Sequence, residues 1–581
     1  MNGLKVDELS VRYIGRSERA LDEISLDVTA GHIVALAGRT GSGKSTLCLA
    51  SSGLVPRVVR AAVTGSILLG SADCEVEATK ANAADLGGRV GIVFSTPSLQ
   101  LSASKPTVRE ELAFGLENLG IARAEMDGRI DAAMSRLGVE HLADREPLAL
   151  SGGEQQRVAI AAIVVMGTGV VVLDEPTAQL DPQGTSEITE LLSEMAADGR
   201  AVLVSEHAAD VLGAAGSCLV LDKGRVVARG LPGEVLARSE ANSAGIDPPT
   251  VVTLAIAAGV TASAAFNERA IAAGLAAKPV RDVREPSPGT RIEETSHGEP
   301  ILVRATTPVS IEVKGLSHTY AGGVEALRGV DLAISPGEAV AIIGQNGSGK
   351  TTLVKHLNGL LRPTAGQIVI DGRDTASRLV SDLARTVGFV FQDPDDQLFH
   401  SRVDREVAFG PRNMGFDSAH ISTVVESALK LTRLTDQRAT NPYDLDLSTR
   451  KLVALAGVLA TESPVLVLDE PTMGQDGPGR HSIESIIRAW RSTGRTVIAI
   501  SHDMEFVARN FDRIVVMRQG QIVLDGPPSM VFAPTNVTVL ESTGLRPPPA
   551  ARIAALMGLS VVSFDAADLI NASLAISASR Q

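Results

Sequence analysis

The chain has 581 residues, of which 44% are apolar and 21% are charged. This length predicts two domains that each bury a core of their own, and the composition fits a globular protein. The formal net charge of −14 argues against nucleic acid as a partner, because a nucleic-acid-binding protein needs a basic face.

We expect neither a signal peptide nor a transmembrane segment. The N-terminal residues lack a signal-peptide pattern, and the longest run without charged residues, 158–173, is short for a bilayer span and contains Gly-Thr-Gly. The end of a buried helix, a turn and a buried strand are expected there. The three cysteines show neither metal-ligand spacing nor a Cys-x-x-Cys pair, which favours a reducing, cytosolic compartment.

A phosphate-binding loop (P-loop) is predicted near the start of the chain. Residues 4–28 alternate as strands do, and an apolar strand at 33–37 precedes Gly-Arg-Thr-Gly-Ser-Gly-Lys-Ser-Thr and a helix. The glycines let backbone N–H groups turn around phosphate oxygens, and the helix points its positive N-terminus at the anion. The lysine can reach the β- and γ-phosphates, and the next hydroxyl can bind Mg²⁺. The residues assigned to nucleotide binding here are Gly38, Arg39, Thr40, Gly41, Ser42, Gly43, Lys44, Ser45 and Thr46.

Three further segments of the first half carry candidate functional residues. Leu-Ser-Gly-Gly-Glu-Gln-Gln-Arg at 150–157 opens an apolar helix, a buried strand at 170–173 ends at Asp174 and Glu175, and a strand at 201–204 leads to His207. A single carboxylate pair at a strand end, or a single histidine, is usually ordinary capping or packing. The assignment therefore depends on their order and on their repetition.

The second half repeats the first after a segment, residues 278–307, that is rich in charge, proline and glycine and is predicted to be an exposed linker. Asp469 and His502 each lie 295 residues after their counterparts, so the repeat holds its register across that span. A second P-loop follows the apolar strand at 339–343. Its assigned nucleotide-binding residues are Gly344, Gln345, Asn346, Gly347, Ser348, Gly349, Lys350, Thr351 and Thr352.

One tyrosine recurs at the same place in both halves. Tyr13 and Tyr320 each follow a strand-like segment about thirty residues before a P-loop lysine, where an aromatic ring can stack on adenine. A lone tyrosine at a strand end more often packs against its neighbours, but the recurrence favours stacking.

This order of motifs in both halves closely resembles that of the ATP-binding-cassette (ABC) ATPases. The resemblance implies an α/β fold with two tandem P-loop NTPase domains, each with a mixed-sheet core, a helical signature subdomain and a small C-terminal helical appendage. We place the two domains at 1–240 and 309–540. The first appendage with the linker takes 241–308, and the second appendage takes 541–581.

The resemblance also implies how ATP and Mg²⁺ are bound. The two cassettes meet head to tail within the chain, and each ATP lies between the P-loop of one cassette and the signature of the other. Lys44 and Lys350 hold the β- and γ-phosphates. The implied signature contacts to the γ-phosphate are Ser151, Gly152 and Gly153. The implied catalytic residues are Glu175, Glu470, His207, His502 and Gln392. The implied metal ligands are Ser45, Asp174, Thr351, Gln392 and Asp469.

The sequence departs from the family pattern at two places. The glutamine expected after the Val-Phe strand is Gln392 in the second half, but the first half has Ser95, which is too short to reach a metal and the attacking water. Counting back from the Asp-Glu strand, Leu-Asp-Leu-Ser-Thr at 445–449 takes the place of the signature at 150–154, so both glycines are lost and Asp446 stands where phosphate is expected. An alternative register with a two-residue deletion would give Ser448 the place of Ser151 and assign it to nucleotide binding.

Both departures fall on the composite site built on Lys44, and the site built on Lys350 is intact. We therefore expect one hydrolytic site and one site that mainly binds ATP. Two active sites with tolerated drift remain the alternative, since Glu175 and His207 are both present.

The function implied by the resemblance is that of the ATPase of a membrane uptake transporter. The Ala-Phe-Gly-x-x-Asn-x-Gly segments and the Gly-x-x-Pro-Pro tails resemble the energy-coupling-factor (ECF) branch, which imports vitamins or nickel and cobalt ions. The implied partners are integral membrane subunits, a scaffold and a substrate-binding component, at the cytoplasmic face of the cell membrane. A tandem ABC ATPase acting on ribosomes or DNA, and a tandem sugar-importer ATPase, are the alternatives.

Overall fold

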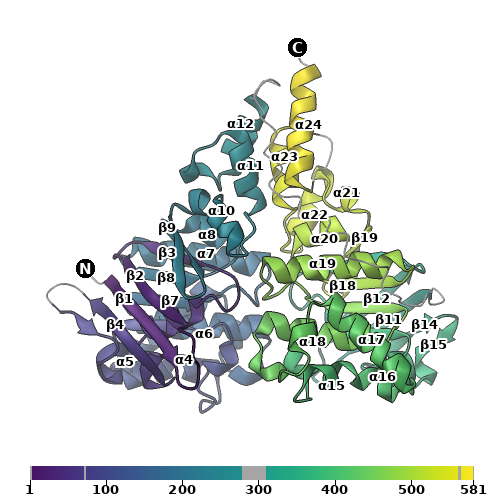
Figure 1. Ribbon diagram of the computed structural model, residues 1–581, viewed down its shortest axis with the longest axis horizontal. Coiled ribbons are helices and arrows are strands. Elements are labelled where there is room, and N and C mark those ends of the chain that lie inside the picture. The colour runs from purple at the N-terminus through teal and green to yellow at the C-terminus, as the bar shows by residue number, and fades with distance from the viewer. Residues whose placement is uncertain (1–2, 71–73, 278–308, 560–563, 580–581) are drawn as a thin grey trace. The chain divides into compact units, whose positions relative to one another are not determined.

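The computed structural model describes residues 3–70, 74–277, 309–559 and 564–579 (Figure 1). The chain divides into two compact units. Unit 1 comprises Met1–Ile256 with Val260–Asn267, and unit 2 comprises Ala257–Gly259 with Glu268–Gln581. The predicted linker, residues 278–307, lies outside the described residues.

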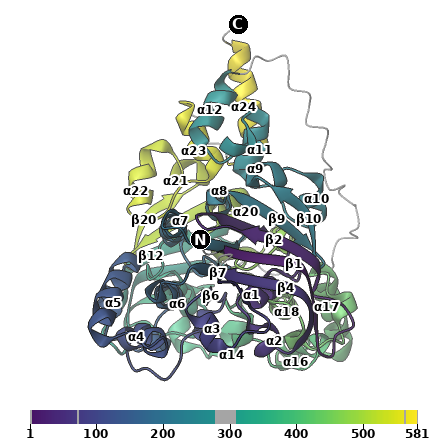
Figure 2. The same ribbon diagram turned by 90° about the vertical axis from the view of Figure 1, so that its left-hand side faces the viewer.

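Unit 1 contains two β-sheets. The antiparallel sheet has the order β2-β1-β4-β5 and is visible in Figure 2; its strands are β1 (Gly3–Tyr13), β2 (Leu21–Val28), β4 (Ala61–Gly70) and β5 (Val76–Glu77). The mixed sheet has the order β10-β9-β3-β8-β7-β6, with only β10 antiparallel to its neighbour. Its strands are β3 (Ile33–Ala37), β6 (Val90–Val93), β7 (Val170–Asp174), β8 (Ala201–Ser205), β9 (Ser217–Asp222) and β10 (Arg225–Gly230).

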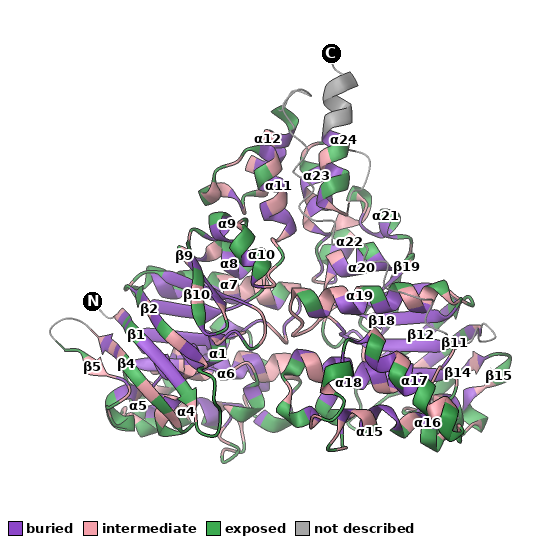
Figure 3. Cartoon of the chain, viewed as in Figure 1, coloured by how far each residue is buried: buried purple, intermediate pink, exposed green. Residues whose placement is uncertain are grey.

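Buried aliphatic side chains hold these layers together. The central strands β3, β7 and β8 are buried along their whole length (Figure 3), as expected for parallel strands covered on both faces. One core cluster fills the space between the two sheets, and the other joins the mixed sheet to its helices. The helices are α1 (Lys44–Ser51), α2 (Leu54–Arg57), α3 (Ala83–Gly87), α4 (Val108–Asn118), α5 (Arg123–Leu137), α6 (Gly152–Met166), α7 (Pro182–Ala197), α8 (Ala209–Ala214), α9 (Pro232–Val235), α10 (Ser239–Ser243) and α11 (Thr250–Ala258).

Unit 2 repeats this architecture with the same strand orders. Its antiparallel sheet is β12-β11-β14-β15, formed by β11 (Ile311–Thr319), β12 (Glu325–Ile334), β14 (Ala365–Ile370) and β15 (Arg373–Asp374). Its mixed sheet is β16-β17-β18-β13-β19-β20, formed by β13 (Ala339–Ile343), β16 (Val387–Val390), β17 (Val465–Asp469), β18 (Thr496–Ile500), β19 (Arg513–Arg518) and β20 (Gln521–Gly526). The predicted α/β fold with two tandem domains is therefore confirmed.

The helices of unit 2 follow the same plan with one break. They are α13 (Lys350–Leu357), α14 (Val380–Ala384), α15 (Val403–Val407), α16 (Phe409–Asn413), α17 (Ser418–Leu431), α18 (Leu447–Leu459), α19 (Gly477–Ser492), α20 (Met504–Asn510), α21 (Pro528–Val531), α22 (Val537–Glu541), α23 (Pro549–Leu556) and α24 (Ala566–Ser579). Where unit 1 has the single helix α4, unit 2 has α15 and α16. Pro411 has no N–H to donate to the turn before it, which explains the break.

The alanine-rich helices α11 and α23 lie in the two segments expected to be helical appendages, 241–308 and 541–581. The helix that follows α11 in the chain, α12 (Glu268–Ala277), belongs to unit 2, where it packs against α23 and α24. Arg552 of α23 forms an ion pair with Glu268 of α12. Among the described residues, no helix is both long and apolar enough to cross a membrane.

Two candidate nucleotide-binding sites

The parallel strands bring the predicted motifs of each unit to one edge of its mixed sheet. In unit 1, β8 lies between β3 and β7, so the P-loop after β3, the carboxylates at the end of β7 and the histidine after β8 are neighbours. In unit 2, β18 lies between β13 and β17 in the same way. Ligands bind at this edge in open α/β sheets, because loops and helix N-termini converge there.

Both P-loops have the same geometry. Helices α1 and α13 begin at Lys44 and Lys350, each after a glycine in the left-handed region, with φ of 109° and 101°. Lys44 Nζ donates to the Gly38 carbonyl at 2.6 Å, and Lys350 Nζ donates to the Gly344 carbonyl at 2.7 Å. Each lysine side chain therefore lies across its own loop and is buried at the N-terminus of the helix.

Glycine is required at the first position of both loops. A Cβ at Gly38 would lie 2.5 Å from the Leu221 carbonyl, and a Cβ at Gly344 would lie 2.3 Å from the Met517 carbonyl. The close approach of strands β9 and β19 therefore fixes the path of the loop, and backbone N–H groups can face a phosphate.

The glutamate of each Asp-Glu pair has a strained backbone conformation, and its side chain is buried in Glu470 and partly buried in Glu175. Glu175 and Glu470 have φ of 48° and 49°, in the left-handed region that residues other than glycine rarely adopt. In unit 1, Glu175 Oε1 lies 3.7 Å from His207 Nε2 and 3.9 Å from Lys44 Nζ. In unit 2, Glu470 Oε1 lies 3.1 Å from His502 Nε2.

The two glutamates have different ionisation environments. Burial raises the pKa of Glu470 above its ordinary value, and the charges of Lys350 and Lys451 only partly offset that effect. Burial also acts to raise the pKa of Glu175, but the hydrogen bond and charge of His207 and the charge of Lys44 outweigh it, so the net direction is downward. A general base works best when its pKa is close to the working pH, so the Glu470 environment is the more favourable one for proton abstraction.

The aspartates fit the predicted role in Mg²⁺ binding. The hydroxyls of Ser45 and Thr351 act to lower the pKa of the Asp174 and Asp469 carboxyls, and Oδ1 of each carboxylate is buried without a hydrogen bond to any described residue. Burial, with the neighbouring glutamate, raises the pKa of both aspartates to about 6. Carboxylate and hydroxyl oxygens are ligands that Mg²⁺ accepts, and it commonly takes few of them and completes its shell with phosphates and water. No group of three or more His, Cys, Asp or Glu side chains suited to a metal occurs among the described residues, so these sites are not all-protein cages.

The recurring tyrosines make the same contact in both units. The Tyr13 hydroxyl donates to Thr46 Oγ1 at 3.0 Å, and the Tyr320 hydroxyl lies 3.0 Å from Thr352 Oγ1. Each tyrosine is thus tied to the P-loop helix with part of its ring accessible. Stacking on adenine stays a prediction.

The structure separates Gln392, which is predicted to be catalytic, from a glutamine with a structural role that occurs in both units. Gln100 and Gln397 each accept a hydrogen bond from the phenylalanine N–H six residues earlier and donate to a helix carbonyl, of Ala159 and Ala454. They are structural equivalents, so Gln100 does not replace the glutamine that unit 1 lacks. Gln392 lies by the Asp-Glu loop, with its Nε2 3.5 Å from Met473 Sδ, and Ser95 takes its place in unit 1.

The two signature segments begin their helices at corresponding residues. Ser151 is the N-cap of α6 and forms a capping box with Glu154, and Asp446 is the N-cap of α18 and accepts from Thr449 N–H at 2.8 Å. These N-caps are 295 residues apart, which supports the register without a gap. Ser448 lies inside α18, and its buried hydroxyl donates to Gln475 Oε1 at 2.8 Å. Helix α6, which follows Ser151, packs against α4 and α5.

One exchange between the two units was not predicted. It concerns the first residue of each signature helix and the residue that it contacts in the loop after the Asp-Glu pair. In unit 1, a Cβ at Gly152 would lie 2.1 Å from Gln179 Oε1, so the glycine leaves room for the glutamine. In unit 2, Leu447 and Gly474 stand at the corresponding positions, and a Cβ at Gly474 would lie 3.4 Å from Leu447 Cδ2. The larger side chain of the pair is therefore Gln179 in unit 1 and Leu447 in unit 2. A position-by-position comparison of the two halves could have found this exchange.

Lys451 is a second residue that sequence reasoning missed. Its Nζ is buried and donates to the carbonyls of Glu470, at 3.2 Å, and Met473, at 2.8 Å. Burial lowers the pKa of Lys451 to about 8, against the opposing effect of Glu470. Gln156 occupies the corresponding position of α6, and its amide makes no hydrogen bond with the described residues.

Comparisons with known proteins agree with this geometry. The family described as ABC transporter matches residues 21–178 and 327–473. A putative ABC transporter ATP-binding protein of Methanosarcina acetivorans is 37% identical over 558 residues, covering 95% of this chain and 90% of that protein. One from Methanosarcina mazei is 35% identical over 577 residues, covering 98% and 96%. Among solved structures, cbiO1 from Clostridium perfringens, part of the ABC transporter complex cbiONQ, is 36% identical and covers 44% of this chain and 100% of that chain, with a TM-score of 0.38.

Proposed function

The chain is an ATPase of the ABC transporter family, and from this premise we propose that it energises an uptake transporter of the ECF type. The single observation that carries ATP hydrolysis is the repeated cluster of P-loop lysine, Asp-Glu pair and histidine at the edge of each mixed sheet. The ECF assignment is supported by the Ala-Phe-Gly-x-x-Asn-x-Gly segments and the Gly-x-x-Pro-Pro tails. The cargo would be a vitamin or a transition-metal ion, chosen by the membrane subunits.

The residues of each unit would divide the chemistry between them. Lys44 and Lys350 would bind the β- and γ-phosphates. Ser45 with Asp174, and Thr351 with Asp469, would hold Mg²⁺, which neutralises phosphate charge when it is bound. Glu470 would polarise the attacking water, and His502 would contact the γ-phosphate while it orients that glutamate.

We further propose that the two ATP sites are unequal. The proposal takes the head-to-tail pairing from the family resemblance, so that the P-loop of unit 1 works with the signature of unit 2. Three features favour hydrolysis at the Lys350 site: Gln392 is present, the partner signature Ser151-Gly152-Gly153 is complete, and burial raises the pKa of Glu470. The Lys44 site combines Ser95 with Asp446 at the signature N-cap. It would bind ATP and turn over slowly.

The experiment that tests the transport role is affinity purification of the full chain from native membranes in mild detergent, followed by mass spectrometry. We expect a polytopic scaffold protein and a small membrane-embedded substrate binder to co-elute, and the ligand of that binder names the cargo. Recovery of ribosomes or DNA-repair proteins, or of no membrane protein, would overturn the transport role and leave only the ATPase.

A further inference from the structure

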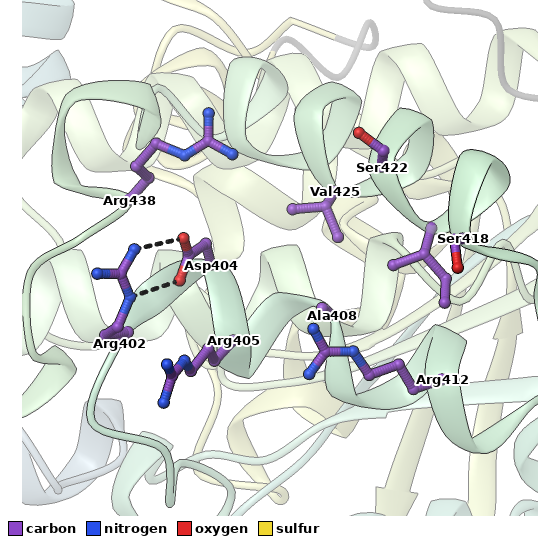
Figure 4. Close-up of a pocket in the computed structure, with 10 residues that line it drawn as sticks. Arg402, Asp404, Arg405, Ala408, Arg412, Ser418, Ser422, Val425 and Arg438 are labelled. Atoms are coloured by element: carbon purple, nitrogen blue, oxygen red, sulfur yellow. Dashed lines mark hydrogen bonds and ion pairs between the residues drawn. The ribbon is translucent and has the colours of Figure 1, made fainter.

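A pocket of about 610 Å³ lies in the helical part of unit 2, between α15, α16 and α17 (Figure 4). Four of its ten lining residues are arginines, and the only acid among them is Asp404. The lining therefore carries a net charge of about +3 in a chain whose net charge is −14. The four arginines are Arg402, Arg405, Arg412 and Arg438.

Two of the arginines are uncommitted. Arg402 forms two hydrogen bonds with Asp404, at 3.0 and 2.7 Å, and Arg438 lies 3.4 Å from Glu426. Within the described part of the chain, the guanidinium groups of Arg405 and Arg412 make no hydrogen bond or ion pair. The single acid in the pocket is thus already paired, and positive charge remains.

The rest of the lining suits an ester with an organic part. Ser418 and Ser422 place hydroxyl groups on the first turns of α17, and Ala408, Ile421 and Val425 supply an apolar floor. A volume of about 610 Å³ is in the range of small-molecule sites.

The corresponding face of unit 1 has the opposite charge balance. The positions 295 residues earlier than Arg405 and Arg412 are Glu110 and Glu117, and Asp127 takes the place of Ser422. Arg109 on that face is paired, since it binds Asp131 at 2.7 Å and lies 3.6 Å from Asp127. Because the two halves share a fold, this charge reversal does not follow from the fold, and it marks a property of unit 2 alone.

We propose that this arginine pocket binds the phosphate group of a phosphate ester. Guanidinium groups bind phosphate oxygens through paired, charge-assisted hydrogen bonds, and a phosphate offers enough oxygens and charge for several arginines at once. The ester can be an anionic phospholipid headgroup or a soluble phosphate ester. The shared chemistry is the phosphate, and the apolar floor takes part of the organic group.

The test uses the full chain with both P-loops filled by Mg²⁺ and saturating ADP, so that phosphate probes do not report on them. One arm measures co-sedimentation with phosphatidylcholine vesicles, with and without phosphatidylglycerol. The other arm measures binding of sn-glycerol 1-phosphate by calorimetry. The variant is Arg405→Gln/Arg412→Gln, which removes two exposed charges, and the matched control is Arg109→Gln/Arg123→Gln on the corresponding face of unit 1.

We expect binding in at least one arm, weakened about tenfold or more by the unit 2 variant and less than about twofold by the control. Binding to phosphatidylglycerol vesicles alone identifies a lipid headgroup, and binding of glycerol phosphate identifies a soluble ester. Equal weakening in both variants would show non-specific attraction and overturn the proposal. So would the absence of binding in both arms, or binding of a polyglutamate peptide in place of either phosphate probe.

Discussion

The two units share their P-loop geometry but differ around the glutamate of the Asp-Glu pair, which is Glu175 in unit 1 and Glu470 in unit 2. Each P-loop lysine donates to the first glycine carbonyl of its loop at nearly the same distance, 2.6 and 2.7 Å. In contrast, the pKa of Glu175 is lowered and that of Glu470 is raised. The P-loop geometry is therefore the same in both units, whereas the environment of the proposed general base is not.

The two halves differ in side chains at a few positions and agree in their backbone. The parallel strands and the P-loops are fixed by backbone packing, as the glycine contacts show. The differences lie in side chains at the start of α6 and α18 and within these helices. They are Ser151 against Asp446, Gly152 against Leu447, and Gln156 against Lys451, and the fold is the same in both units. Four predictions, in decreasing order of expected effect, test whether these differences make the two sites unequal.

The largest effect is expected from removal of the proposed general base. Glu470→Gln keeps the shape of the side chain and removes its ability to accept a proton, so steady-state ATP turnover should fall by about a hundredfold or more. Glu175→Gln should lower it by less than about threefold, if the Lys44 site contributes little turnover. A phosphate-release assay at saturating ATP makes the measurement.

Binding of a fluorescent ATP analogue is the control, since neither substitution changes a residue of a P-loop. Comparable losses of turnover from Glu470→Gln and Glu175→Gln would contradict unequal sites and favour two active sites with tolerated drift.

The second prediction concerns the support of the catalytic loop by Lys451. A buried ammonium group that donates to the carbonyls of Glu470 and Met473 restricts the loop that carries the general base. Lys451→Gln, which installs the residue of unit 1, should lower kcat about fivefold and leave KM for ATP within about twofold.

Gln156→Met is the matched substitution in unit 1. Because the Gln156 amide makes no hydrogen bond with the described residues, turnover should change by less than about twofold. A rise in KM at unchanged kcat, or an equal loss from both substitutions, would argue against a positioning role for Lys451.

The third prediction restores the second signature. Asp446→Ser/Leu447→Gly/Ser448→Gly rebuilds Ser-Gly-Gly at the N-terminus of α18, and combination with Ser95→Gln should raise total turnover about twofold, because a second site then contributes. In this background, Glu175→Gln should remove the gain. If turnover rises and Glu175→Gln leaves the gain in place, the gain does not come from the Lys44 site.

The motifs could be predicted from sequence because they depend on short-range patterns. A P-loop combines a strand, glycines at fixed spacing and a helix within about fifteen residues, and the strand ends that carry Asp174 and His207 meet because neighbouring parallel strands end at one edge. The register of 295 residues also predicted Asp446 as the counterpart of Ser151, and the N-caps of α6 and α18 agree.

The remaining features depend on contacts between residues far apart in the chain. Lys451 reaches carbonyls about twenty residues away through a buried path that no local pattern encodes. The exchange of Gly152 and Gln179 for Leu447 and Gly474 can be found by comparing the two halves, but only the structure shows that the two positions lie in contact. By contrast, the break between α15 and α16 depends on one residue, Pro411, and could have been predicted from the sequence of unit 2.

The smallest effect concerns a histidine pair that only unit 2 contains. His356 on the P-loop helix has its Nε2 3.2 Å from His318 Nδ1 and its Nδ1 2.7 Å from the Thr352 carbonyl, whereas Ala50 and Val11 stand at the corresponding positions of unit 1. Burial lowers the pKa of His356 below its ordinary 6.5, and the neighbouring His318 adds to this effect. The folded chain therefore binds this proton less readily than the unfolded chain, and unit 2 should lose stability as the pH falls below about 6.5.

Trp490, the only tryptophan, is buried in unit 2, so its fluorescence reports the unfolding of that unit. We expect the fall in Tm between pH 7.5 and pH 5.5 to be smaller by a few degrees in His356→Ala, and unchanged in the control His32→Ala, an exposed residue of unit 1. Because each Tm difference is taken within one variant, the cavity that His356→Ala leaves cancels, and an unchanged difference would show that His356 does not make unit 2 more acid-sensitive.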